Sequence, residues 1–127
     1  MRILIADDAG FIRQIIRDAY VEAGHEIVAE SSNGPDTILY ALEQKPDLAI
    51  IDIVLPELNG LEAMTEIKQQ CPEIILVATS SLTTDWIENE AKKTGCIYFL
   101  RKPFTKEELL RVLEMAHLQK GREIKHG

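Results

Sequence analysis

The sequence contains few of the residues that mark a disulfide-rich or membrane-spanning chain. Only two of its 127 residues are cysteines, Cys71 and Cys96, and they form no CxxC pair. We therefore expect two reduced thiols in a cytosolic protein. No apolar run approaches the roughly 20 residues that a membrane-spanning helix needs. The amino terminus has no basic flank or cleavage site before its first apolar run. Neither membrane insertion nor a signal peptide is predicted.

Positive charge is also scarce. Fourteen Lys and Arg residues face 21 Asp and Glu residues, the formal net charge is −7, and there is no long basic block. Because nucleic-acid binding depends mainly on neutralising phosphates, direct binding of nucleic acid by this chain is not expected. An excess of carboxylates is compatible with binding a cation. The length and the 46% hydrophobic content suit one compact domain.

Five short apolar runs alternate with five segments of helical spacing. Several of the runs are almost continuously apolar, which is typical of strands buried on both faces of a parallel sheet. Strict alternation predicts an α/β fold, a doubly wound five-stranded parallel sheet with five helices and right-handed crossovers. The expected strands are residues 2–6, 26–31, 47–52, 74–80 and 97–102, and the expected helices are residues 10–23, 35–44, 60–70, 84–94 and 105–118.

Local signals predict where several helices begin and end. Gly24 and Gly95 stand where the first and fourth helices should stop, and Thr105 with Glu108 forms a capping box at the start of the last helix. After Leu118 the chain becomes polar and loses its periodicity. We therefore expect a domain over residues 1–118 and a fraying polar tail over 119–127.

Polar side chains gather where the predicted strands end. Asp7 and Asp8 follow the first strand, Asp52 ends the third, Ser80 the fourth and Lys102 the fifth. In open α/β sheets, ligands bind beyond the carboxyl ends of the strands. A single strand-end Asp is often only a helix cap or turn former. Five such residues at one edge favour a functional site.

The chemistry of this edge suits a hard cation and a phosphoryl group. Three neighbouring carboxylates repel one another unless a cation lies near. Oxygen-only ligands suit Mg²⁺, and no His or Cys lies close enough in sequence to suggest zinc. A divalent cation, a lysine and a hydroxyl would together hold phosphoryl oxygens. A carboxylate can accept such a group as an aspartyl-phosphate.

These residues resemble the motifs of the response-regulator receiver domain family. The matching segments are "DD" after the first strand, "DIVLPELNG" from Asp52, "TSS" at the end of the fourth strand and "KPF" at the end of the fifth. The resemblance covers about residues 1–118, and within the family the chain is most similar to stand-alone chemotaxis receivers of the CheY type. It implies a flavodoxin-like fold with strand order 2-1-3-4-5.

The resemblance also implies roles for individual residues. Asp52 would accept the phosphoryl group, and Lys102 would pair with a phosphoryl oxygen. Asp8 and Asp52 would ligate Mg²⁺ directly and Asp7 through water, while the backbone carbonyl of Val54 would complete the protein's share.

Two further positions match the switch residues of the family. Ser80 lies 22 positions before Lys102, where relatives carry a switch Ser or Thr, and Phe99 lies three before it, where they carry a switch aromatic. The bond between Lys102 and Pro103 is cis in many relatives. Pulling Ser80 towards the phosphoryl group would open space that Phe99 can enter.

The implied function is a phosphorylation-dependent signalling switch of a two-component system, located in the cytoplasm. A histidine kinase or histidine phosphotransfer protein would supply the phosphoryl group. The surface of the fourth helix, fifth strand and fifth helix would then change to control a downstream protein target, as in chemotaxis. Phe11 and Trp86 are either partner contacts or packing residues. Because no external substrate is turned over, the chain is not expected to be an enzyme.

Two apolar positions predict slow hydrolysis of the aspartyl-phosphate. Val54 and Leu82 lie two residues after Asp52 and Ser80, where relatives often carry polar side chains that position the hydrolytic water.

Three other interpretations of the chain stay open. The chain could be a receiver excised from a longer regulator with a DNA-binding or enzymatic output domain. A flavodoxin would need a phosphate-binding loop where the two aspartates lie. An aspartyl-phosphate hydrolase would need a second Asp at the position of Val54.

Overall fold

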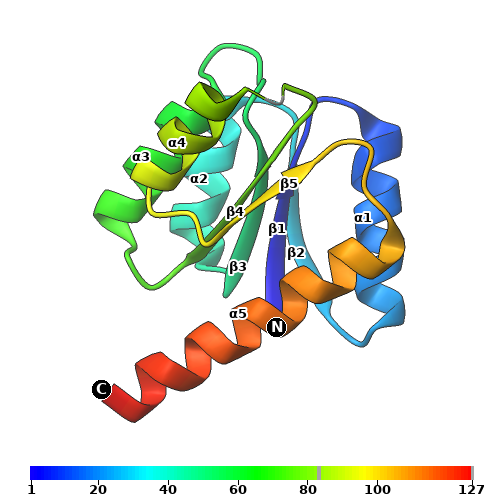
Figure 1. The fold of residues 1–127 in the computed structure, drawn as a ribbon, viewed down its shortest axis with the longest axis vertical. Coiled ribbons are helices and arrows are strands. Elements are labelled where there is room, and N and C mark those ends of the chain that lie inside the picture. The colour runs from blue at the N-terminus through cyan, green and yellow to red at the C-terminus, as the bar shows by residue number, and fades with distance from the viewer. Residues whose placement is uncertain (83, 127) are drawn as a thin grey trace.

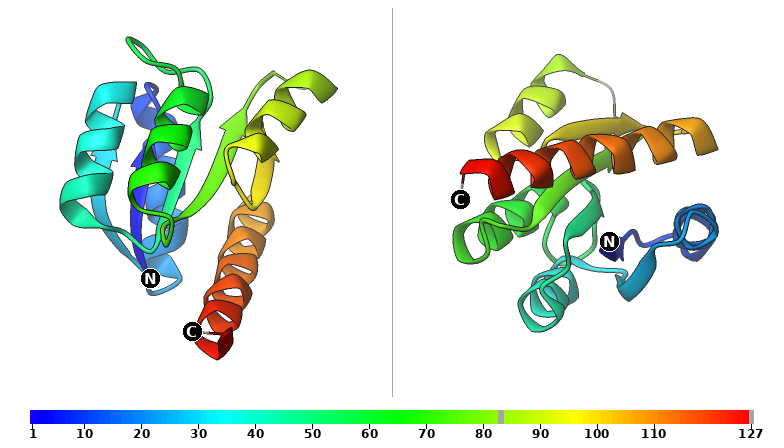
Figure 2. Two further views of the ribbon diagram at one scale, coloured as in Figure 1. Left: turned by 90° about the vertical axis from the view of Figure 1, so that its left-hand side faces the viewer. Right: turned by 90° about the horizontal axis from the view of Figure 1, so that it is seen from below.

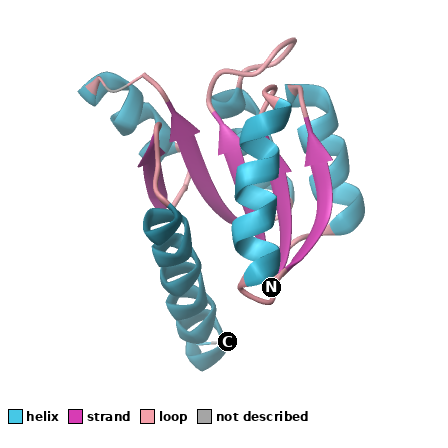
Figure 3. Ribbon diagram, turned by 90° about the vertical axis from the view of Figure 1, so that its right-hand side faces the viewer, coloured by secondary structure: helices cyan, strands magenta, loops and turns pink. Residues whose placement is uncertain are grey.

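Strands and helices alternate along the whole chain in the computed structural model, which describes residues 1–82 and 84–126. The strands run parallel, and their arrows point the same way in Figure 3. The elements are β1 (Arg2–Ala6), α1 (Gly10–Glu22), β2 (Glu26–Ser31), α2 (Gly34–Gln44), β3 (Leu48–Asp52), α3 (Gly60–Gln70), β4 (Ile75–Ser80), α4 (Asp85–Lys93), β5 (Tyr98–Arg101) and α5 (Lys106–His126).

The five strands form one parallel sheet in the order β2-β1-β3-β4-β5. Helices α1 and α5 cover one face, and α2, α3 and α4 cover the other (Figure 1 and Figure 2). The predicted fold class and strand order are therefore confirmed. Register brings the strand ends level, since Asp52 pairs with Thr79 and Ser80 pairs with Arg101. The carboxyl ends of β1, β3, β4 and β5 consequently meet at one edge.

Apolar side chains from both faces of the sheet form two separate core layers. Alternate residues of one strand point to opposite faces, so each central strand supplies both layers. Under α1 and α5 the layer includes Ile5, Ile50, Val77, Tyr20 and Val112. Under α2, α3 and α4 it includes Leu4, Ile51, Leu76, Met64 and Ile67. Because both faces are covered, the fully buried strands β3 and β4 carry no polar residue until their carboxyl ends.

Helix termini follow the local signals. Gly24 and Gly95 adopt φ values of +92° and +95°, a conformation that residues with a Cβ rarely take. At the start of α5, the Glu108 N–H donates to Thr105 Oγ1 at 3.1 Å, and Glu108 Oε1 accepts from the Thr105 N–H at 3.2 Å. The predicted capping box is therefore present.

The last helix is longer than the sequence predicted. α5 continues to His126, through the segment expected to be a fraying tail, while Gly127 lies outside the described residues. Its last turns run beyond the end of the sheet (Figure 1). The packed first turns nucleate the helix, and extending a formed helix is much cheaper than starting one. An ion pair between Lys120 and Asp47, just before β3, also holds the extension. The boundary at residue 118 stays a prediction.

No helix in the described ranges has the length and apolar content needed to cross a membrane. Both cysteines are free thiols, Cys71 buried and Cys96 half-buried.

Candidate functional site

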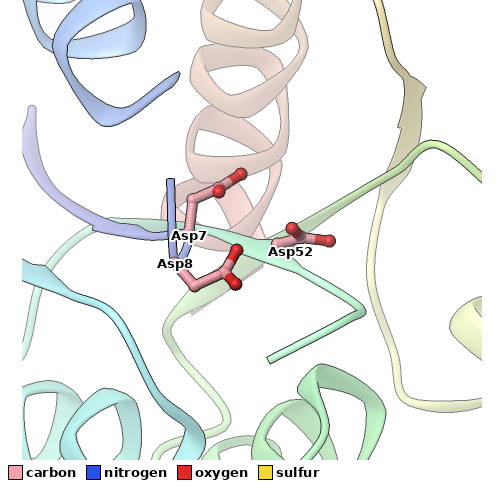
Figure 4. A group of neighbouring side chains, drawn as sticks. All are labelled: Asp7, Asp8 and Asp52. Atoms are coloured by element: carbon pink, nitrogen blue, oxygen red, sulfur yellow. The ribbon is translucent and has the colours of Figure 1, made fainter. Parts of the chain in front are cut away.

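Three carboxylates meet at the carboxyl edge of the sheet. Asp7 and Asp8 follow β1 and Asp52 ends β3, and each offers a carboxylate oxygen within 4.8 Å of the other two. Figure 4 shows the Asp7 and Asp8 side chains both extending to the side on which Asp52 lies. Asp7 and Asp52 are 1% and 5% exposed, whereas Asp8 is exposed. The cluster is thus buried on one side and open to solvent on the other.

One lysine, Lys102, forms ion pairs with both buried carboxylates. Lys102 Nζ donates to Asp7 Oδ2 at 2.7 Å and to Asp52 Oδ2 at 2.9 Å. Burial raises the pKa of Asp52 above its usual value, although Lys102 and the Val54 amide oppose that rise. Burial alone would lower the pKa of Lys102, but its bonds to the two aspartates raise it instead. Lys102 is therefore charged, and its single positive charge is shared by the two buried carboxylates of a cluster that holds three.

Three side chains at strand ends each accept the same kind of local hydrogen bond. An oxygen of Asp7, Asp52 and Ser80 accepts a hydrogen bond from the main-chain N–H two residues later, at 2.9, 3.0 and 2.9 Å respectively. This is the turn that Asp and Ser side chains form readily. It fixes Oδ1 of each buried aspartate towards its own loop and leaves Oδ2 for Lys102.

Close main-chain packing sets the loop after β3. A Cβ on Gly60 would lie 2.1 Å from the Asp52 carbonyl oxygen, and a Cβ on Gly34 would lie 2.0 Å from the Leu58 carbonyl oxygen. The Gly60 N–H donates to the Ile53 carbonyl at 2.7 Å. Only glycine fits at these two positions, because a Cβ under 3.0 Å from backbone would push the loop away. The first turns of α2 and α3 thus fix the main chain that carries Asp52.

The two predicted switch residues lie on adjacent strands. Ser80 is fully buried at the end of β4, and Phe99 is half-buried on β5 against the α2–α4 core layer. The Lys102 N–H donates to the Ser80 carbonyl at 2.9 Å, and the Lys102–Pro103 bond is cis. Phe99 also lines a groove of about 400 Å³ between α4, β5 and α5. Lys102 is therefore linked to this groove through Ser80, to which it is hydrogen-bonded, and Phe99, which lines the groove.

Four large apolar side chains in or near the segments that follow the strands are exposed. Phe11 and Trp86, which the sequence left between docking and packing, are 68% and 65% exposed. Val54 and Leu82 are also exposed. None of the four belongs to the buried core, so packing inside the domain does not account for them.

Sequence reasoning missed one residue of the site, Arg13 on α1. Its Nη1 donates to the main-chain oxygen of Asp7 at 2.7 Å, and its Nε donates to Glu30 Oε1 at 3.2 Å. In the sequence it is an ordinary cation one turn into a helix. No residue pattern distinguishes it from Arg17, one turn later.

The oxygen atoms of this cluster suit the binding of a hard divalent cation. Mg²⁺ is held by a few carboxylate and carbonyl oxygens together with water, and this cluster supplies oxygen ligands and surplus negative charge. The exposed carboxylate of Asp8 gives access from solvent. No His or Cys takes part in the cluster.

Comparison with known proteins gives one consistent result. The family model described as "Response regulator receiver domain" matches residues 3–114. The chemotaxis protein CheY of Thermotoga maritima is 35% identical over 112 residues, which cover 88% of this chain and 93% of that protein. The transcriptional regulatory protein PdtaR of Mycobacterium tuberculosis is 35% identical over 97% of this chain but only 59% of its own length.

A solved structure agrees with these relatives. The response regulator domain of Thermotoga maritima CheB superposes with a TM-score of 0.81 at 28% identity, covering 93% of this chain and 94% of that one. The family model spans most of the chain, the CheY relatives are matched along nearly their full length, and the strand order is the one the family resemblance implied. The chain therefore belongs to the response regulator receiver domain family of two-component signalling, with CheY-like proteins among its relatives.

Proposed function

We propose that this chain is a cytoplasmic phosphorylation-dependent switch that accepts a phosphoryl group on Asp52, with Mg²⁺, from a histidine kinase or a histidine phosphotransfer protein. The observation that carries the proposal is the position of Asp52. Its carboxylate is almost fully buried, contacts Lys102 at 2.9 Å and lies within 4.8 Å of Asp7 and Asp8. The proposed nucleophile therefore lies beside both a cationic partner and the proposed metal ligands.

The transfer step follows from this placement. An oxygen of the Asp52 carboxylate attacks phosphorus as the phosphorus–nitrogen bond of a phosphohistidine breaks, and the imidazole leaves with that electron pair. Asp8, Asp52 and the Val54 carbonyl would ligate Mg²⁺ directly, with Asp7 acting through water. When bound, Mg²⁺ supplies positive charge to the phosphoryl oxygens. Lys102 exchanges Asp52 Oδ2 for a phosphoryl oxygen, so its contact is replaced rather than lost.

The change then spreads along β4 and β5. Ser80 Oγ accepts from the Leu82 amide, so its O–H is available to donate to a phosphoryl oxygen. Movement of Ser80 towards Asp52 opens space on the α4 side, which Phe99 can enter from its half-buried position. The phosphoryl group shifts the balance between two arrangements by as much as it binds one better than the other. The α4–β5–α5 surface would present the result to a downstream protein, in a chemotaxis-type pathway.

In this function the chain would turn over no external substrate. One phosphoryl group is taken up per chain and is lost slowly, because Val54 and Leu82 offer no polar group to orient water. We expect a lifetime well beyond seconds, shortened by Val54→Asn. A lifetime of seconds that Val54→Asn leaves unchanged would contradict this part of the proposal.

The direct test is mass spectrometry of the intact chain after incubation with a small-molecule phosphodonor. We expect a Mg²⁺-dependent mass gain of one phosphoryl group that is absent in Asp52→Asn. A gain that persists in Asp52→Asn would place the acceptor elsewhere. Continuous release of phosphate from the donor, far beyond one equivalent, would indicate an enzyme.

A specific alternative is that this chain is the receiver part of a longer regulator. The chain spans 59% of PdtaR and 36% of a protein-glutamate methylesterase/protein-glutamine glutaminase of Archaeoglobus fulgidus. A receiver of this kind can thus form part of a longer regulator with its own output domain. Sequence of the source gene on both sides of residues 1–127 distinguishes this from a stand-alone switch.

A further inference from the structure

We infer that Arg13 is a positioning residue for the metal site, acting through the peptide unit between Asp7 and Asp8. Its Nη1 donates to the Asp7 main-chain oxygen at 2.7 Å, and its Nε donates to Glu30 Oε1 at 3.2 Å. The guanidinium therefore joins α1 and β2 to the end of β1. The inference rests on the proposed function, because it concerns the same Mg²⁺ site.

The peptide unit matters because the direction of the Asp8 side chain depends on the main chain around it, which the hydrogen bond from the Ala9 amide to Asp7 Oδ1 also restrains. Within residues 1–82 and 84–126, no hydrogen bond or ion pair involves the Asp8 side chain, which is exposed. Asp7 is different, since its carboxylate is held by the Ala9 amide and Lys102. The peptide is planar, so a bond to the Asp7 carbonyl fixes the direction in which the chain enters Asp8. Arg13 thus sets where the Asp8 carboxylate can reach.

An arginine suits this position better than a lysine. The planar guanidinium donates in two directions from one rigid group, whereas an ammonium is a point charge on a flexible stem. Arg13 and Glu30 are 24% and 26% exposed in their side chains, so both groups are restrained. The Glu30 carboxylate, which also pairs with Arg17, offsets part of the Arg13 charge and so reduces repulsion of an incoming cation.

Arg17 provides a matched control on the same helix. Its Nη1 contacts Glu30 Oε2 at 2.6 Å, but among the described residues it makes no hydrogen bond or ion pair with Asp7. Removing either arginine takes a cation from Glu30. Only removal of Arg13 also releases the peptide between the two aspartates. Any effect specific to Arg13 therefore reports on the carbonyl contact.

The experiment is calorimetric titration of the whole chain with Mg²⁺ alone, together with urea unfolding of each variant. We expect Arg13→Met to raise the Kd for Mg²⁺ about tenfold, the lower end of what loss of a supporting contact costs a metal site. Arg17→Met should stay within twofold of wild type. Arg13→Lys should remain raised at least about threefold, because it restores charge without the two-way geometry.

The outcomes separate the two proposals. Equal Kd values for Arg13→Met and Arg17→Met would overturn the inference while leaving the Mg²⁺ site in place. Absence of Mg²⁺ binding by wild type would overturn the proposed function and the inference with it. If Arg13→Met does not fold, Arg13→Gln replaces it. A Kd within twofold of wild type in that variant would equally overturn the inference.

Discussion

At the carboxyl end of the sheet, the ammonium of Lys102 contacts two buried carboxylates, whereas at the amino end the ammonium of Lys120 contacts one carboxylate among the described side chains, that of Asp47. The Asp47 Oδ2 also accepts from the Arg2 amide at 2.8 Å. Both ends therefore join a lysine from late in the chain to an aspartate from a central part of the sheet. They differ in how many carboxylates each lysine must balance.

The difference shows in the pKa values of two aspartates. Burial raises the pKa of Asp52, and Lys102 does not fully offset it. Burial also opposes ionisation of Asp47, but the Arg2 amide and Lys120 together hold its pKa below the usual value. A balanced pair such as Asp47 with Lys120 is a device for stability. A surplus of carboxylates such as that of Asp7, Asp8 and Asp52 lowers stability on its own and suits a site that could bind a cation.

The sharpest way to break this comparison is to neutralise one aspartate at each end. Asp52→Asn should abolish phosphoryl uptake, because an amide is not a competent acceptor. Asp47→Asn should leave uptake unchanged. Intact-protein mass spectrometry with a small phosphodonor and Mg²⁺ measures both. Loss of uptake in Asp47→Asn without loss of fold would show that the two ends are not independent.

Removing the lysines should give the largest difference in stability. Lys102→Met leaves two buried carboxylates without their ion-pair partner and should lower the free energy of unfolding by about 3 kcal/mol without Mg²⁺. Lys120→Met should cost no more than about 1 kcal/mol, since a third of the Lys120 side chain is exposed.

Urea unfolding with and without Mg²⁺ completes that test. Added Mg²⁺ should recover most of the loss in Lys102→Met, because the cation replaces the missing positive charge. It should recover none of the loss specific to Lys120→Met. Similar losses at the two ends, or recovery at both, would contradict the distinction.

Metal binding alone should separate the ends by a slightly smaller amount. Mg²⁺ at 100 times its Kd should stabilise wild type by about 2.7 kcal/mol and raise Tm accordingly. Asp8→Ala should show little of this shift, whereas Asp47→Asn should keep it. Differential scanning calorimetry measures all three chains. A full shift in Asp8→Ala would remove that residue from the proposed ligand set.

The smallest expected effect is a pH dependence at the amino end. Because the folded-state pKa of Asp47 is lowered, its contribution is present above the unfolded pKa of about 3.9 and is lost as pH falls through the folded value. Asp47→Asn should therefore cost up to about 1 kcal/mol near neutrality. The difference from wild type should shrink below pH about 4. A constant difference down to acid unfolding would show that Asp47 acts by something other than its charge.

The sequence predicted the fold class and the edge of the sheet at which the three carboxylates cluster, because strand periodicity fixes which residues end each strand. It also predicted that Asp7, Asp8, Asp52 and Lys102 meet. It did not predict that Lys102 bonds both buried aspartates, which lie 95 and 50 positions away. Partner choice at that separation depends on how side chains turn, and periodicity carries no such information.

Two further omissions have the same cause. The ion pair of Asp47 with Lys120 spans 73 positions and lies in a segment that the sequence marked as a tail. Arg13 acts through a main-chain oxygen, which every residue possesses and no sequence pattern identifies. Contacts to the backbone are thus the part of a site hardest to predict from residue types.

The loop from Asp52 to Gly60 has a consequence for how this protein can vary. Its ends are joined by the hydrogen bond from Gly60 to Ile53, and no side chain fits between Gly60 and the Asp52 carbonyl. Exposed positions such as Val54 can change in chemistry without altering that closure. The close packing at Gly60 fixes the two ends of the loop, whereas the side chains of its exposed positions are free to differ. Under the proposed function, substitutions at those positions would change the lifetime of the phosphoryl group without moving Asp52.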